Sequence, residues 1–135
     1  MKRTAMVKNN GTSIIAHARP YLTTEGGHGV FGRGKGELLA AVEKMGSLRN
    51  AAAILGRSYR QAWGDINNAE KYLGFSLVTR LRGGPCGGTM QLTERGKLFL
   101  RAWELHCRKV AVAVEKSYIK NVKSVINYPK EAFNG

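Results

Sequence analysis

The side chains with the clearest chemical capacity lie between residues 57 and 67 of this chain. Arg60 can donate two hydrogen bonds to O6 and N7 of guanine, and Gln61 can pair with N6 and N7 of adenine. Gly64 lacks a side chain and permits close approach of another molecule. The candidate base-reading residues are Arg57, Tyr59, Arg60, Gln61, Gly64 and Asn67. Trp63, beside them, is expected to have a structural role rather than to stack on a base.

These residues need a helix that exposes them, and the sequence predicts one over residues 58–73. Ser58 followed by Gln61 is a capping-box pattern, which starts a helix. The apolar residues that follow recur at helical spacing and define the buried face: Ala62, Ile66, Ala69 and Leu73.

A shorter helix precedes it after a tight turn. Ser47 can cap this helix, and Gly56 can end it in the left-handed conformation. Its apolar face comprises Leu48, Ala51, Ala52 and Leu55. Two helices joined so closely must cross steeply, which is the helix-turn-helix geometry, and its second helix can enter a DNA major groove.

A hairpin is predicted directly after the second helix, as in the wing of a winged helix. Residues 75–82 and 89–92 read as its strands, and the Gly-rich run 83–88 is its tip. Cys86 is interpreted as part of an ordinary tip without a redox role. The candidate phosphate contacts come from this wing (76–92) and from the two helices: Arg49, Ser58, Lys71, Arg80, Arg82, Gly84 and Gly87.

The segment before these elements predicts an arm, a β-element and a helix. Residues 1–13 are interpreted as a flexible basic arm. Residues 14–23, which contain Pro20, are expected to form an edge strand that returns through Val30 and Phe31. The Gly-rich run 32–36 lacks the Gly-Lys-Ser/Thr ending of a phosphate loop, so we interpret it as a loop before a helix at about 35–45.

A long final helix is predicted after Thr93, with an apolar stripe of about five turns. The stripe comprises Phe99, Ala102, Trp103, His106, Val110, Ala113 and Val114. A second copy of the chain could cover part of it, and the alternative is a helix that folds back on its own domain. His106 is expected to be a packed core histidine, not a metal ligand. One domain over residues 14–126 and a tail over 127–135 are therefore expected.

Charge and composition favour a polyanionic partner. The chain has 22 Lys and Arg against 9 Asp and Glu, a net charge of +13, and Asp65 is its only aspartate. No carboxylate pair or nucleophile–base spacing predicts an enzyme, and neither a catalytic residue, a metal site nor a cofactor is expected. The sequence lacks the apolar run of a membrane span or signal peptide, so we expect no membrane partner and a cytoplasmic location.

The run from Gly36 to Leu100 resembles the DNA-binding domain of the ModE-type regulators, a winged-helix group related to the LysR-type helix-turn-helix. The resemblance implies a dimeric, prokaryotic transcriptional regulator, located with the nucleoid. These regulators carry a C-terminal molybdate-binding module for which this chain leaves no room, so no molybdate site is expected. The matching residues are Gly46-Ser47-Leu48, Ala51-Ala52, Leu55-Gly56-Arg57-Ser58-Tyr59-Arg60-Gln61-Ala62-Trp63, Gly83-Gly84-Pro85-Cys86-Gly87-Gly88 and Leu92-Thr93-Glu94-Arg95-Gly96.

The sequence thus predicts a mainly α fold with a small β wing (α+β), a winged helix-turn-helix with a long C-terminal dimerisation helix. The favoured function is a regulator that binds duplex DNA sequence-specifically as a homodimer. The alternative is a basic nucleoid-associated or RNA-binding protein without sequence preference, and a third possibility is a winged helix that binds protein.

Overall fold

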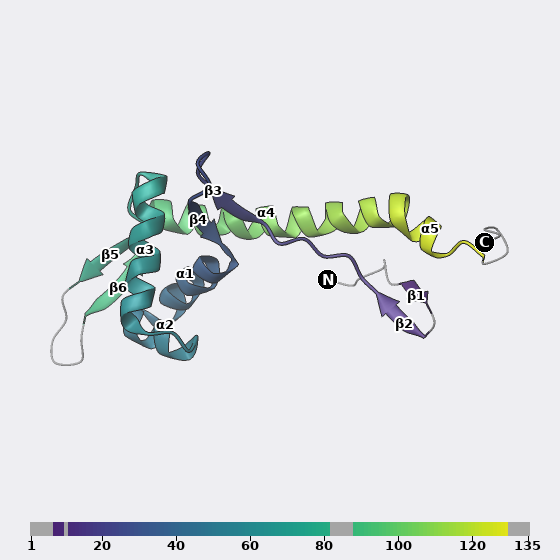
Figure 1. Ribbon diagram of the computed structural model, residues 1–135. Helices are drawn as coiled ribbons and strands as arrows, with labels where there is room; N and C mark the ends of the chain where they lie inside the picture. Colours follow the sequence, from purple (N-terminus) through teal and green to yellow (C-terminus); the bar gives the residue numbers. More distant parts are fainter. Residues whose placement is uncertain (1–6, 10, 82–87, 130–135) are drawn as a thin grey trace. The chain divides into compact units, whose positions relative to one another are not determined.

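The computed structural model describes residues 7–9, 11–81 and 88–129 (Figure 1). Its contacts divide the chain into two compact units. The central unit is Pro20–Leu105, and the terminal unit combines Met1–Arg19 with His106–Gly135. The predicted domain boundaries at residues 14 and 126 differ from those of the two units and stay a prediction.

The central unit begins with the hairpin of β3 (Tyr21–Thr23) and β4 (Gly29–Gly32), which pair antiparallel. The turn is closed by a bond from the Thr24 amide to the His28 carbonyl of 2.8 Å. The predicted edge strand over residues 14–23 is wrong in its length, since residues 15–20 form no strand. Pro20 lies directly before β3, where its missing N–H costs no ladder bond.

Helix α1 (Arg33–Met45) starts two residues before the predicted start at Lys35. Gly32 precedes it in an extended conformation and provides no side-chain cap. Leu38, Leu39 and Val42 are buried, as predicted. Gly46 ends the helix with φ +69°, the left-handed conformation that favours glycine.

Helices α2 (Leu48–Ile54) and α3 (Tyr59–Leu73) confirm the predicted helix-turn-helix. Gly56 has φ +67°, its amide bonds the Ala53 carbonyl, and the Arg57 amide bonds the Ala52 carbonyl. These two bonds are those of the Schellman motif that ends many helices. The Oγ atom of Ser58 then accepts a bond of 3.0 Å from the Gln61 amide, so α3 begins where the capping pattern predicted.

The wing strands are β5 (Val78–Leu81) and β6 (Thr89–Leu92), which pair antiparallel with Val78 opposite Leu92. β5 starts three residues later than predicted, because the backbone before it has other partners. The Leu77 amide donates to Glu70, and the carbonyls of Ser76 and Leu77 accept bonds from Thr93.

Helix α4 (Glu94–Tyr118) begins at a crowded corner of the central unit. The Thr93 hydroxyl donates to the Ser76 carbonyl and accepts from the Gly96 amide, so Thr93 caps the helix as predicted. A Cβ atom at Gly96 would overlap the Leu77 carbonyl oxygen. This close approach explains physically why glycine stands three residues after the capping threonine.

An aromatic group closes the core of the central unit. The rings of Phe31 and Phe99 meet edge to face at 4.8 Å, and those of Phe31 and Trp103 at 5.1 Å. Gly36 lets α1 pass Trp103 closely, since a Cβ atom there would lie 2.9 Å from the indole nitrogen. Leu38, Leu39, Val42, Leu77 and Leu100 are the largest fully buried side chains.

The terminal unit holds a second hairpin and the end of the long helix. β1 (Val7–Asn9) pairs antiparallel with β2 (Thr12–Ile14), so a flexible arm over residues 1–13 is wrong for this part of the chain. Gly11 takes φ +79° in the turn, and the Asn-Gly dipeptide at 10–11 is the hairpin signal that we missed.

After Tyr118 the helix continues as the π-helical turn η1 (Ile119–Lys123) and α5 (Ser124–Ile126). Tyr118 is buried against Ile14, Ala16 and Ile126. His106 is exposed, so the expectation of a packed core histidine is wrong. The apolar stripe provides core contacts near its start, where Trp103 is buried, and carries exposed residues beyond it.

Candidate nucleic-acid interface

Helix α3 presents one polar face to solvent. At about 100° per residue, four of its residues fall within a sector of about 60°: Arg60, Gly64, Asn67 and Lys71, all exposed. The opposite face carries Ala62, Ile66 and Ala69, which are buried. The buried stripe therefore fixes which side of α3 is available to a ligand.

The candidate residues at the start of α3 differ in their exposure and in their contacts within the fold. Arg60 and Gln61 are exposed to solvent. Ser58 uses its oxygen as the cap acceptor, and its O–H group is still a donor that can reach a phosphate. Tyr59 is half-buried and lies against other aromatic and cationic groups.

Arg57 is engaged within the unit. Its Nη1 atom donates a bond of 2.9 Å to the Gly34 carbonyl in the first turn of α1. This bond joins the starts of the two helices, and a Cβ atom at Gly34 would make an ordinary van der Waals contact with the guanidinium at 3.4 Å. Base reading by Arg57 stays a prediction, and the geometry gives it a role in placing α3.

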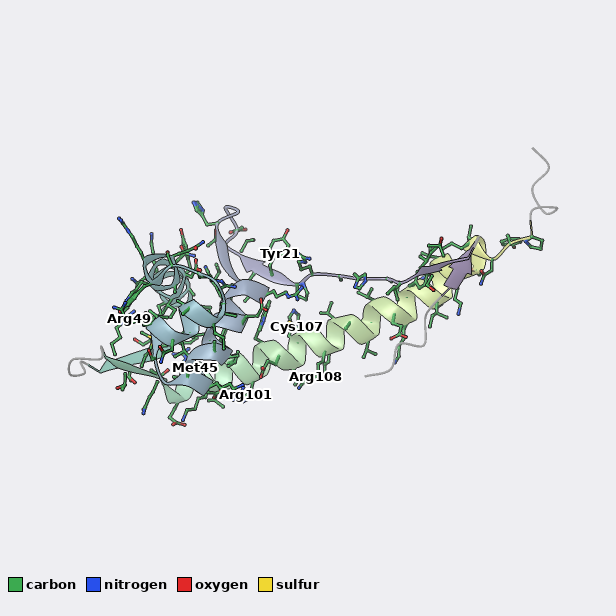
Figure 2. The ribbon with its side chains drawn as sticks, turned by 90° about the horizontal axis from the view of Figure 1, so that it is seen from below. Tyr21, Met45, Arg49, Arg101, Cys107 and Arg108 are labelled. Atoms are coloured by element: carbon green, nitrogen blue, oxygen red, sulfur yellow. The ribbon has the colours of Figure 1, made fainter. Side chains whose placement is uncertain are left out.

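Two stacked aromatic rings of α3 lie between two guanidinium groups. The Arg49 guanidinium, labelled in Figure 2, is 4.8 Å from the centre of the Tyr59 ring. The Tyr59 and Trp63 rings are stacked at 6.1 Å, and the Arg80 guanidinium lies 4.4 Å from the centre of the Trp63 ring. The stack joins α2, α3 and β5, and its contacts give Trp63 the expected structural role.

Glu70 links α3 to the wing, and it is a residue that we missed. Its Oε2 atom accepts bonds of 2.7 Å from the Leu77 amide and 3.3 Å from the Val78 amide. Its Oε1 atom lies 3.1 Å from Arg80 Nη2, which also donates to Asn67 Oδ1 at 2.7 Å. A carboxylate on a helix of a strongly basic chain was the available signal.

The β3–β4 hairpin supports the other side of α3. Asn68 Nδ2 donates a bond of 3.0 Å to the Gly29 carbonyl. The Lys71 ammonium lies 5.2 Å from the centre of the Tyr72 ring, at the edge of the exposed face. The Asn68 bond thus ties the second half of α3 to the β3–β4 hairpin, whereas the contact between Lys71 and Tyr72 lies within α3.

A partly buried lysine connects the start of α1 to β4. Lys35 Nζ donates a bond of 3.0 Å to the Val30 carbonyl. Burial lowers the pKa of Lys35, and the negative charge of Asp65 opposes that shift in part. Lys35 thus holds β4 to α1. The loop that we expected over residues 32–36 is wrong, because residues 33–36 already form the first turn of α1.

Several predicted residues lie outside the described part of the chain. These are Arg82, expected at the end of the first wing strand, and Gly84, Cys86 and Gly87 of the expected wing tip. Within residues 7–9, 11–81 and 88–129, the structure has no group of three or more His, Cys, Asp or Glu side chains that could hold a metal ion. No helix of that part is long and apolar enough to span a bilayer.

Comparison with known proteins agrees with this geometry. Residues 36–97 match the family model of the bacterial regulatory helix-turn-helix proteins of the lysR family. These residues run from the first turns of α1 through the helix-turn-helix and the wing to the start of α4.

Three curated relatives are similar to part of the chain. Molybdenum transport protein ModE of Azotobacter vinelandii is 40% identical over 60 residues, 44% of this chain and 22% of its own length. Molybdenum-pterin-binding protein MopB of Rhodobacter capsulatus is 35% identical over 83 residues, 59% of this chain and 31% of its own. Transcriptional regulator ModE of Yersinia pestis is 34% identical over 68 residues, 50% of this chain and 26% of its own length. The chain thus spans less than a third of these relatives.

Proposed function

Residues 36–97 form a LysR-type helix-turn-helix domain, and from this premise we propose that the protein is a regulator of transcription that binds duplex DNA sequence-specifically. Helix α3 lies in the major groove, and the wing (76–92) lies on the backbone or in the minor groove. The observation that carries this proposal is the exposed polar face of α3, held from both sides by the wing and the β3–β4 hairpin. The protein acts without enzymatic chemistry, in the cytoplasm of a prokaryote.

The base-reading residues of the proposed interface are Arg60, Gln61, Gly64 and Asn67, with Tyr59 and Arg57 at their edge. The exposure of the first four supports this assignment. Backbone phosphates are bound by Arg49 and Lys71 and by the hydroxyl of Ser58. Arg82, Gly84 and Gly87 extend these contacts along the wing. The net charge of +13 favours such binding through the release of counterions.

A homodimer is part of the same proposal. Within the terminal unit, Ile119, Val122 and Val125 recur every three residues and are 40%, 47% and 59% exposed. A second copy of the helix end would cover this apolar row, and a twofold dimer is the commonest oligomer. Two copies of α3 would then meet half-sites about 34–36 Å apart on one face of the DNA.

A selection of bound sequences from random duplex DNA tests the proposal. We expect a palindromic consensus with a half-site spacing of one helical turn or a multiple of it. Binding without any consensus would favour the alternative, a basic nucleoid-associated or RNA-binding protein. Sedimentation of the free protein at micromolar concentration should show a dimer, and a monomer with an asymmetric footprint would contradict the dimeric part.

A further inference from the structure

The contact between Asn67 and Arg80 fixes the orientation of an exposed amide on α3. Arg80 Nη2 donates to Asn67 Oδ1 at 2.7 Å. An arginine side chain has five N–H donors and no acceptor, so the amide oxygen must face it and the amide nitrogen must point away. The assignment of the two amide atoms therefore follows from chemistry.

Arg80 is itself held in place before any ligand arrives. Its Nη2 atom pairs with Glu70 Oε1 at 3.1 Å, and its guanidinium lies over the Trp63 ring. Glu70 is only 14% exposed at its side chain and also accepts the amides of Leu77 and Val78. Contacts with Asn67, Glu70 and Trp63 of α3 thus preorganise the guanidinium, which reduces the cost of ordering it on binding.

The two purines present different groups in the major groove. Adenine offers the N7 acceptor beside the N6 amino donor, and guanine offers two acceptors, N7 and O6. An asparagine reads adenine with both its oxygen and its nitrogen. The oxygen of Asn67 lies against a cation, so a base amino group would have to approach it beside a positive charge. The Nδ2 donors and the cation both favour acceptors.

We propose that Arg80 is a positioning residue that presents Asn67 to DNA as a hydrogen-bond donor, so that the base pair read by Asn67 is recognised through guanine in preference to adenine. This inference rests on the proposed function, because it assigns a base preference to one position of that interface. It gives Arg80 a role other than the phosphate contact predicted for it. Gly64 leaves open space beside Asn67 on the same face, since a Cβ atom there would meet nothing within 4 Å.

The test is a selection from random duplex DNA with the full chain and four variants. Asn67→Ala locates the base pair in question as the position whose preference it abolishes. The natural protein should prefer guanine over adenine there by about 5- to 150-fold, the range expected for a good base contact. In Arg80→Met the amide can turn, and the preference should fall to about twofold or invert toward adenine, with the other positions unchanged.

Arg49→Met is the matched control, because it removes one cation from the same stack of rings. It should weaken all duplexes alike and keep the guanine preference. In Asn67→Ala, the further change Arg80→Met should have no additional effect on base preference at that pair, since Arg80 acts through Asn67. An additional effect there, or the same uniform loss from both arginine variants, would overturn the inference.

The outcomes separate this inference from the proposed function. A clear consensus with adenine at the Asn67 pair overturns only the inference, and a natural protein without any consensus overturns both. Circular dichroism checks that each variant folds. If Arg80→Met does not fold, the test is the base that the natural protein prefers at the position where Asn67→Ala abolishes the preference. Guanine there supports the inference, and adenine or no preference contradicts it.

Discussion

Gly64→Ala should make the folded protein more stable and its binding to DNA weaker. Gly64 lies inside the helix, is exposed, and is not among the glycines with positive φ. A Cβ atom at this position would meet nothing within 4 Å. Glycine in a helix interior costs about 0.5–1 kcal/mol relative to alanine. The variant should therefore raise the free energy of unfolding by about this amount, and the melting temperature by about 2–6 °C.

The same substitution should weaken binding to DNA. The added methyl group lies in the exposed sector between Arg60 and Asn67, where we propose that the floor of the major groove approaches the helix. An extra carbon in a close-packed contact costs about 1–3 kcal/mol, which is about 5- to 150-fold in affinity for the selected site. Thermal unfolding and fluorescence anisotropy with the selected and a random duplex measure both effects on one sample.

Two other glycines provide matched controls with the opposite sign. A Cβ atom at Gly36 would lie 2.9 Å from the Trp103 indole nitrogen, and one at Gly96 would overlap the Leu77 carbonyl oxygen. Gly36→Ala and Gly96→Ala should each lower the free energy of unfolding by about 1–3 kcal/mol or more. A more stable Gly64→Ala protein with unchanged affinity would refute the proposed contact of this face with DNA, and a less stable one would refute the reasoning about open space.

Three further predictions concern the interface and its control. Arg60→Ala and Gln61→Ala should each cost about 1–3 kcal/mol on the selected site and much less on random DNA, and equal losses in the binding isotherms would show that α3 does not read bases. Arg82→Ala should weaken every duplex alike and lower the slope of log affinity against log salt by about one unit, and a sequence-dependent loss would exclude a phosphate contact. Molybdate should leave the DNA affinity unchanged, because we expect no molybdate site here and an effector shifts an equilibrium only through different contacts with its two states. Saturable heat on titration of molybdate in a calorimeter would contradict this.

Local chemistry made the helix-turn-helix predictable from the sequence. Ser47, Gly56 and Ser58 act within four residues of themselves, so their caps and the left-handed turn follow from residue type and spacing alone. The buried faces of α1 and α3 follow in the same way from helical periodicity. The hairpin at residues 7–14 was equally local, and we missed it by giving the basic composition more weight than the turn signal at Gly11.

The contacts that join different elements were not predictable in this way. Glu70 and Arg80 are ten residues apart, and nothing in their spacing says that the wing strand turns back beside α3. Thr93 and Gly96 could be seen as a helix start, but the requirement for glycine comes from the Leu77 carbonyl, nineteen residues earlier in the chain. Such pairs depend on how the helix and the hairpin pack, which the periodicity of either element does not contain.

The base that Asn67 recognises depends on one of these contacts between elements. By residue type alone, an exposed asparagine on a recognition helix is a reader of adenine, because its amide offers one donor and one acceptor. In the folded protein a guanidinium from the wing lies against the acceptor of Asn67, and Glu70 holds that guanidinium through the same carboxylate that begins the wing strand. The wing thereby changes the chemistry of the recognition helix without itself touching the base. If Arg80 presents Asn67 as a donor, as we propose, a code that assigns bases from the residues of α3 alone would assign the wrong purine at this position.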